Sequence, residues 1–240
     1  MDVVISQSMY FPWVGFLEQI SLADIYVRYD DVQFSKGSFT NRVQIKTSSG
    51  IRWLTVPLEN RRLGQRINEV SFSSDLKWCK THLQNLAAAY RPAPYFDEMI
   101  GLAESVIMES EHKDLGALAF ASTASLAKYY GLFGKARTIN IDDFSVPGTG
   151  SSRVLEIVRM LGGTRYITGH GARNYLDHEA FEAAGIEVRY IRYSCTPYEQ
   201  LDGSFTPFVT ALDLVANLGR SGIRCIRPQT VNWRDFLNEA

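Results

Sequence analysis

A strand, a short helix and a second strand follow one another within the first thirty residues, and this order constrains the fold more than any other feature of the chain. Residues 3–6 are an apolar run typical of a buried strand, Pro12 suits the first turn of a helix over about 13–22, and residues 25–27 are again apolar. Strands joined in this way run parallel, because the helix carries the chain back to the same end of the sheet. The pattern predicts an α/β fold with a mostly parallel sheet.

The same alternation of strands and helices returns after residue 136, with strands predicted at 137–141, 165–168 and 186–193 and helices at 152–161, 178–184 and 206–218. Two further features interrupt the sheet. Residues 41–46 and 51–58 flank a turn of polar residues and glycine, which predicts a β-hairpin. Helical periodicity holds over about 75–131, which predicts a helical insertion that forms a cap or a lid. We expect one α/β domain over 1–240, with helices flanking the sheet.

Composition narrows the class of protein and of partner. The 240 residues are 45% hydrophobic and 21% charged with a net charge of −1, which is typical of a globular chain and offers no general basic field for duplex nucleic acid. Three cysteines without close spacing predict neither a disulfide framework nor a zinc site. No basic leader and no apolar run of about eighteen residues is found, so we expect a cytoplasmic protein that is not inserted in a membrane.

Asp30 and Asp31 are the first catalytic candidates, because they end the second predicted strand. Ligands of open α/β sheets bind outside the carboxyl ends of the strands. A carboxylate that loses water or shares a site with another has a raised pKa and can act as a general base. Only one of two adjacent side chains is expected to face a given pocket. The alternative is that one Asp caps a turn while the other is solvated.

Other polar and aromatic side chains of the N-terminal region are binding candidates. Arg42 and Lys36 could hold a phosphate or carboxylate beside Asn41, although they could equally pair with the two aspartates. The remaining candidates in this region are Gln7, Tyr10, Trp13, Gln33 and Trp53, of which the tryptophans could instead be core residues.

His170 is the third catalytic candidate. It lies in the sequence Thr168-Gly169-His170-Gly171 directly after a predicted strand, with Gly169 and Tyr175 as binding candidates beside it. A histidine titrates near neutral pH and can transfer a proton, although one in a glycine-rich turn can also be structural. Because both candidate segments follow parallel strands, we expect Asp30 or Asp31, Arg42 and His170 to surround one cavity.

Several signatures are absent from the sequence. It has no P-loop, no GxGxxG, no GxSxG, no HExxH and no set of residues with metal spacing, so no metal is predicted and no cofactor can be named.

A long ordered set of residues resembles the WbqC-like family of bacterial proteins. In the N-terminal half the set comprises Gln7, Tyr10, Pro12-Trp13, Gly15-Phe16, Ala23-Asp24, Asp30-Asp31-Val32-Gln33-Phe34, Lys36, Phe39, Asn41-Arg42, Ile45 and Trp53-Leu54-Thr55-Val56-Pro57. In the C-terminal half it comprises Tyr166, Gly169, Tyr175, Phe181, Gly185-Ile186, Tyr190, Tyr198, Gln200, Leu212-Asp213-Leu214, Asn217 and Gly219. The family pattern has a His before the glutamine and a Pro after it, where this chain has Ser6 and Ser8. A role for that His therefore does not carry over.

The resemblance implies a place in O-antigen, other surface-polysaccharide (lipopolysaccharide) or amino-sugar biosynthesis, and for some members a glycine transferase role. The expected activity is the transfer of an acyl or aminoacyl group to a sugar nucleotide. Such a reaction needs a base, donors for an oxyanion and a cationic holder, roles that Asp30 or Asp31, Asn41 with Tyr10, and Arg42 with Lys36 could fill.

Two alternatives stay open. The order of strand, Pro-Trp-x-Gly loop and helix is similar to the first unit of ATP-using nucleotidylyltransferases, although Trp13-Val14-Gly15-Phe16 replaces their HxGH signature. The other alternative is a non-catalytic subunit that binds a sugar nucleotide. In each case the partner is a small molecule, and the oligomeric state is not predicted.

Overall fold

A six-stranded sheet organises the structure, a computed structural model that describes residues 1–109, 112–134 and 136–239. Its strands are β1 (Asp2–Ser6), β2 (Ile25–Arg28), β7 (Arg137–Asn140), β8 (Arg165–Thr168), β9 (Glu187–Arg192) and β10 (Gln229–Asn232). They lie in the order β10-β9-β8-β1-β2-β7, and every neighbouring pair is parallel except β9 with β10. The predicted mostly parallel sheet is confirmed.

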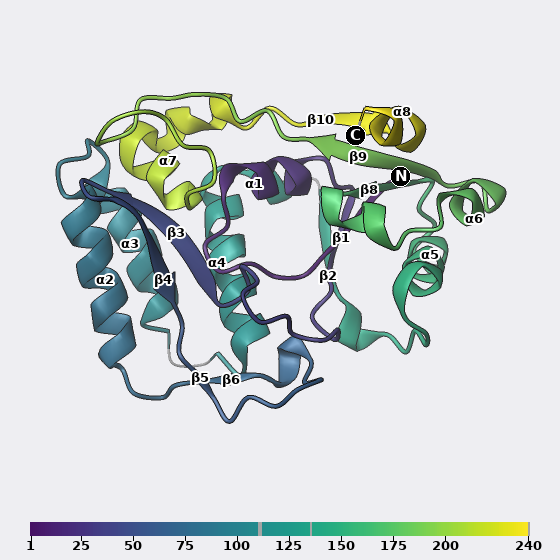
Figure 1. Cartoon of the computed structure of the whole chain (residues 1–240), viewed down its shortest axis with the longest axis horizontal. Helices are drawn as coiled ribbons and strands as arrows, with labels where there is room; N and C mark the ends of the chain where they lie inside the picture. The colour runs from purple at the N-terminus through teal and green to yellow at the C-terminus, as the bar shows by residue number, and fades with distance from the viewer. Residues whose placement is uncertain (110–111, 135, 240) are drawn as a thin grey trace.

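The two faces of the sheet bury alternate residues of the same strands. Val3 and Ile5 of β1 pack with α5 (Gly150–Met160), α6 (His178–Ala183) and α8 (Trp233–Asn238), whereas Val4 packs with α1 (Val14–Ser21) and α4 (Leu115–Tyr129). Figure 1 shows α5 and α6 on one side of the strands and α1 and α4 on the other. Buried on both faces, the central strands have the continuous apolar character that the sequence displays.

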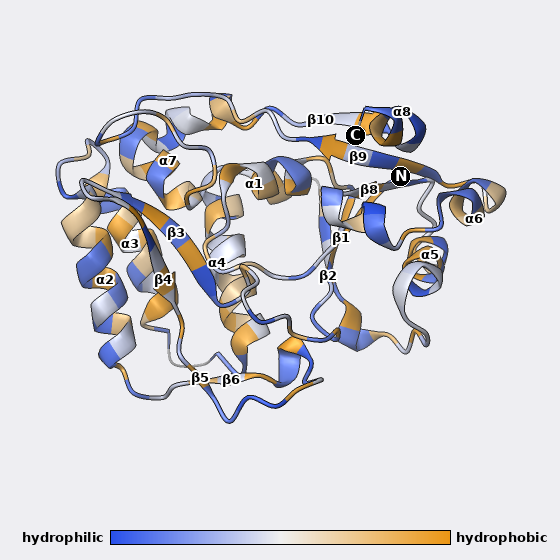
Figure 2. Ribbon diagram, in the orientation of Figure 1, coloured by the Kyte–Doolittle hydropathy of each residue, from blue (hydrophilic) through white to orange (hydrophobic). Residues whose placement is uncertain are grey.

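The helical insertion covers one face of the sheet with α4 and extends beyond the sheet with its other helices. It consists of α2 (Lys77–Tyr90), α3 (Phe96–Ile107) and α4, and α7 (Ala211–Leu218) packs against α3 (Figure 1). The helix α4, whose residues are largely apolar in Figure 2, contacts α1 and α3. A continuous buried cluster links one face of the sheet to these helices, so apolar burial connects the two parts.

The predicted hairpin is formed by β3 (Arg42–Thr47) and β4 (Gly50–Thr55), which pair antiparallel. A second short antiparallel pair, β5 (Leu58–Glu59) with β6 (Ser71–Phe72), follows it. Neither this pair nor the antiparallel edge strand β10 was predicted, because short or exposed strands carry little apolar periodicity.

The helix predicted over 206–218 is wrong in its first turn, because α7 begins at Ala211. The hydroxyl of Thr210 accepts a hydrogen bond from the amide of Leu212 and so caps the helix there. The side chain of Gln200 bonds both the amide and the carbonyl of Thr206, which holds the preceding segment as a loop.

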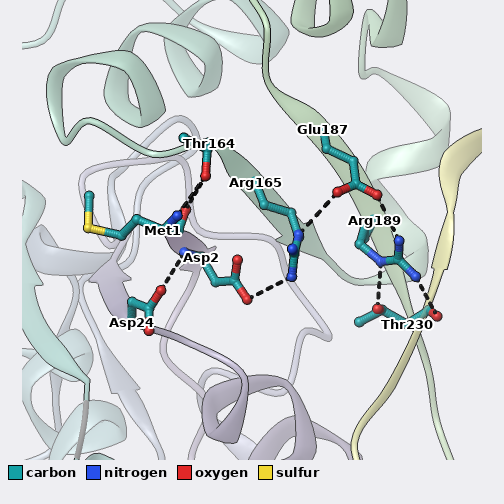
Figure 3. Close-up of polar contacts among 8 residues, drawn as sticks. All are labelled: Met1, Asp2, Asp24, Thr164, Arg165, Glu187, Arg189 and Thr230. Atoms are coloured by element: carbon teal, nitrogen blue, oxygen red, sulfur yellow. Dashed lines mark hydrogen bonds and ion pairs between the residues drawn. The ribbon is translucent and has the colours of Figure 1, made fainter.

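Charged side chains link neighbouring strands at the amino edge of the sheet (Figure 3). Arg165 contacts Asp2 and Glu187, each at 3.1 Å, and Arg189 contacts Glu187 at 2.7 Å and the hydroxyl of Thr230 at 2.7 Å. Asp2, Arg165 and Glu187 are direct cross-strand partners in the sheet register. The first residues of β1, β8 and β9 therefore form one row of alternating charge.

Candidate functional site

The strand order reverses at β1. From β1 the chain builds β2 and β7 on one side, and then returns to build β8 and β9 on the other. Such a reversal leaves a crevice outside the carboxyl ends of the two strands that flank it, where ligands of open α/β sheets bind. A cavity of about 570 Å³ lies there, beyond the ends of β1 and β8, and we call it the switch-point cavity.

Five of the predicted site residues line the switch-point cavity: Gln7, Trp13, Gly169, His170 and Tyr175. They come from the loops after β1 and β8, which the chain separates by more than 150 residues and the parallel sheet brings together. Ser6, which stands where the resembled family has His, also lines it and accepts a hydrogen bond from the side-chain amide of Gln19 at 3.3 Å.

One ring nitrogen of His170 bonds a backbone carbonyl, and the other can take part in proton transfer. Its Nε2 lies 2.8 Å from the carbonyl oxygen of Ile191. Because a carbonyl only accepts, Nε2 carries the proton in this contact, and in the neutral ring Nδ1 is then the basic nitrogen. The ring packs between Tyr193 and Phe236, with centroid distances of 4.8 and 4.9 Å. This arrangement fixes both the tautomer and the orientation of the imidazole.

Tyr193 belongs to the cavity wall although the sequence did not single it out. It follows the last residue of β9, and its ring lies 4.6 Å from that of Trp13. Burial first, and then the nearby Glu18 and Cys195, raise the pKa of Tyr193 to about 12, so at neutral pH it is a hydrogen-bond donor. The signal available in the sequence was its position at the end of the strand predicted over 186–193.

Two glycines make room for this wall. A Cβ on Gly169 would lie 2.9 Å from the Tyr193 hydroxyl. A Cβ on Gly15 would lie 2.3 Å from the Trp13 ring and 2.6 Å from the ring of Tyr193. Neither glycine has a positive φ, so close approach rather than backbone conformation requires glycine here.

Asp30 is fully buried and held by its neighbours. Its carboxylate accepts hydrogen bonds from the amide of Ser8 at 2.9 Å, from the Ser8 hydroxyl at 2.7 Å and from Arg28 at 2.5 Å. Burial raises the pKa of Asp30, and the contacts with Arg28 and Ser8 oppose that rise. This geometry ties the loop after β1 to the loop after β2 and leaves no access for a substrate.

Asp31 does not line the switch-point cavity. Its two oxygens contact the two terminal nitrogens of Arg153, whose Nε donates to the Val146 carbonyl at 2.9 Å. Asp31 and Gln33 line a neighbouring cavity of about 660 Å³, which shares Tyr29, Val32 and Gly150 with the switch-point cavity. Arg153 thus joins the loops after β2 and β7 beside the candidate site.

The remaining predicted residues do not line either cavity. Arg42 stacks on Trp53, 4.2 Å from the ring centroid, and donates to the carbonyl of Gly37. Asn41 is buried and donates to the Val56 carbonyl at 3.1 Å, whereas Lys36 is exposed. Among the described residues, Asp30 or Asp31, Arg42 and His170 therefore do not line one common cavity at this edge, contrary to the expectation.

Tyr10 lies in the core rather than at the site. It is 1% exposed, and its hydroxyl lies 3.0 Å from Nδ1 of His82, whose Nε2 lies 3.2 Å from the Thr55 carbonyl. Burial lowers the pKa of His82 to about 4, so this histidine is neutral at pH 7 and its Nδ1 accepts a hydrogen bond from the Tyr10 hydroxyl.

Two further kinds of feature are missing from the described part of the chain. Over residues 1–109, 112–134 and 136–239, no three or more His, Cys, Asp and Glu side chains are grouped as metal ligands. Within the same ranges, no helix has the length and apolarity to cross a membrane.

Similarity to known proteins extends along nearly the whole chain. The uncharacterized protein Rv1507c of Mycobacterium tuberculosis (strain ATCC 25618 / H37Rv) is 32% identical over 219 residues, which cover 90% of this chain and 94% of the relative. No solved structure matches significantly. The model of the WbqC-like protein family matches residues 7–225, a span that includes the loops of the switch-point cavity. The chain is therefore a member of the WbqC-like protein family.

Proposed function

We propose that this protein is a transferase that joins an acyl or aminoacyl group, glycyl among the candidates, to a nucleotide-linked amino sugar used for surface polysaccharide. The observation that carries the proposal is the switch-point cavity with His170 in its wall. Its position outside β1 and β8 is where open α/β sheets bind nucleotides and related ligands. The family resemblance supplies the pathway context, and the cavity volume of about 570 Å³ suits a small molecule.

The chemistry asks for a base, and the geometry favours His170 over the two aspartates. Asp30 is fully buried by Ser8 and Arg28, and Asp31 is paired with Arg153. In the proposed step, the acceptor amine attacks the acyl carbonyl and gives its proton to Nδ1 of His170. A carbon–nitrogen bond forms, the bond from the acyl carbon to the donor's leaving group breaks, and that group departs with the bonding electrons.

The Tyr193 hydroxyl is a hydrogen-bond donor in the same wall, and its ring packs against that of His170. It approaches Gly169 so closely that a Cβ there would meet it at 2.9 Å. With its proton retained at neutral pH, it can donate a hydrogen bond to the oxygen that becomes negative during attack.

A nucleotidylyl transfer from ATP is the second candidate, and the strand order favours it. Counted along the chain, the sheet reads 3-2-1-4-5 from β7 to β9, the order of dinucleotide-binding sheets, and β10 adds a sixth, antiparallel strand. Release of pyrophosphate on incubation with ATP and a sugar phosphate would identify this reaction instead.

The test is turnover by the purified protein with a panel of nucleotide-linked amino sugars and acyl or aminoacyl donors, followed by mass. His170→Gln keeps a donor for the Ile191 carbonyl but removes the basic Nδ1, so the rate should fall about 10²–10⁴-fold. His112→Gln is the matched control, because the Nε2 of His112 also contacts a backbone carbonyl, that of Val106 at 2.9 Å, away from the cavity. No mass change with any pair of substrates would point to a non-catalytic binding subunit.

A further inference from the structure

A further cavity of about 820 Å³ is lined in part by Trp13, His170 and Tyr193. The same three residues line the switch-point cavity, so the two cavities are neighbours. We call the larger space the β9 cavity, because it is lined by the segment after β9 and by Arg227 before β10. The imidazole of His170 thus borders both spaces.

A buried carboxylate that does not itself line the β9 cavity holds two of its lining segments together. Glu18 is fully buried, and its oxygens accept from the amides of Ser194 and Arg227, both at 3.1 Å, and from the Ser194 hydroxyl. No ion pair with Glu18 is found within the described part of the chain. Burying an unpaired carboxylate is costly, and it here fixes two chain segments that are far apart in sequence. The cavity is therefore held in shape before any ligand arrives.

The lining combines a cation with exposed aromatic surface. Arg227 donates its Nε to the Arg224 carbonyl at 2.9 Å, and within residues 1–109, 112–134 and 136–239 no acceptor is found for its two terminal nitrogens. Arg192, also in the lining, is paired with Glu239. Phe208 is 54% exposed and packs on Trp13 at 5.5 Å. A guanidinium with free terminal nitrogens suits a phosphate or carboxylate, and the aromatic rings suit a flat or apolar group beside it.

We infer that the β9 cavity is a second substrate site, which holds an anionic group donor with its phosphate or carboxylate at Arg227 and its apolar or aromatic part against Phe208 and Trp13. This assignment as the donor site rests on the proposed transferase function. A donor here and an acceptor in the switch-point cavity would meet at His170, the one candidate base among the three residues that line both cavities. The two substrates would then bind independently.

Binding experiments test the site without requiring turnover. Phenyl phosphate combines one aromatic ring with one phosphate, and UDP represents the nucleotide part of the acceptor. By calorimetry, phenyl phosphate should bind the wild type, Arg227→Gln should weaken it at least tenfold, and UDP should bind with the same affinity in the presence of saturating phenyl phosphate. Phe208→Ala should weaken phenyl phosphate but leave inorganic phosphate unchanged. Arg224→Gln, a neighbouring exposed arginine outside the lining, is the matched control.

The outcomes separate this inference from the proposed function. Absence of phenyl phosphate binding, equal binding by the wild type and Arg227→Gln, or displacement by UDP would overturn the second site. Arg227-dependent binding of phenyl phosphate without any binding of UDP would instead reject the nucleotide-linked acceptor and leave the β9 cavity standing as an anion site.

Discussion

The two edges of the same sheet are built in opposite ways. At the amino edge, Asp2, Arg165, Glu187 and Arg189 neutralise one another across β1, β8 and β9 (Figure 3). At the carboxyl edge the strands end in cavities that are walled by aromatic rings. Ion pairs satisfy the charges of one edge internally, whereas the other edge presents polar groups to empty space. Parallel strands thus allow one edge to serve assembly of the sheet and the other to serve ligands.

The carboxyl edge nevertheless includes structural ion pairs, and breaking the one between Arg28 and Asp30 should give the largest effect. Asp30→Ala leaves Arg28, which is 14% exposed, without its buried partner and removes the acceptor for the Ser8 amide. The free energy of unfolding should fall by about 3–5 kcal/mol, measured by urea denaturation. Ser8→Ala keeps the ion pair and should cost clearly less. An Asp30→Ala protein as stable as the wild type would mean that this loop is not anchored by the carboxylate.

The cavity wall predicts a loss of ligand binding with little loss of stability. Gly169→Ala places a Cβ 2.9 Å from the Tyr193 hydroxyl, so the ring must move within the cavity. We expect the affinity of the switch-point cavity for its ligand, with UDP as the probe, to fall by about five- to tenfold, which is about 1–1.4 kcal/mol. The melting temperature should be nearly unchanged. Gly171→Ala is the control, because no atom lies within 4 Å of a Cβ there. Equal binding by the two variants would remove Tyr193 from the site.

At the amino edge, Arg165→Ala should have only a modest effect. Its side chain is 43% exposed and contacts Asp2 and Glu187, both partly exposed. We expect the free energy of unfolding to fall by about 0.5–1 kcal/mol at low ionic strength and by less in 1 M salt. Ligand binding should not change. A large loss that persists in high salt would show that this row is more than a set of screened surface pairs.

Acid titration gives the smallest expected difference. Burial raises the pKa of Glu187, but Arg189 and Arg165 lower it more, so the net shift is downward. A depressed pKa contributes stability that is present above the unfolded value of about 4.3 and is lost as pH falls through the folded value. Glu187→Gln should therefore lose less stability on acidification below about pH 4.5. An identical acid slope in the two proteins would contradict this.

His82 also contributes to the loss of stability on acidification. Its pKa falls to about 4 on folding, so on acidification the unfolded chain binds this proton at a higher pH than the folded protein does. Stability therefore declines as the pH falls from about 6.5 to about 4. This decline occurs in the wild type and in Glu187→Gln alike, and the difference between the two curves isolates Glu187.

Much of the fold was predictable because buried strands and amphipathic helices have strong periodicity. The strands at 3–6, 25–27 and 165–168 lie within β1, β2 and β8, and the helix at 13–22 contains α1. The single-domain organisation stays a prediction. Half-exposed β10 has no such periodicity, and the start of α7 depends on the side chain of Thr210.

The site was partly predictable for a related reason. Residues that follow parallel strands meet at one edge, and Gln7 and His170, which follow β1 and β8, line the same cavity. Arg42 starts a hairpin that leaves the sheet, and Tyr10 turns into the core toward His82. Direction of the chain after a strand is set by tertiary contacts, which no local pattern records. Tyr193 and Arg227 were missed because their segments are brought together by Glu18, a residue distant in sequence that accepts from the amides of Ser194 and Arg227.

The absence of a side chain at Gly15 has a consequence for how this family can diverge. The space that a methyl group would need is already occupied by the rings of Trp13 and Tyr193. A lineage could therefore gain a larger residue at position 15 only if the aromatic at 13 or at 193 became smaller in the same line of descent. The side-chain volumes at positions 13, 15 and 193 are therefore expected to change together. An alignment of relatives in which they vary independently would show that the wall can be rebuilt from other residues.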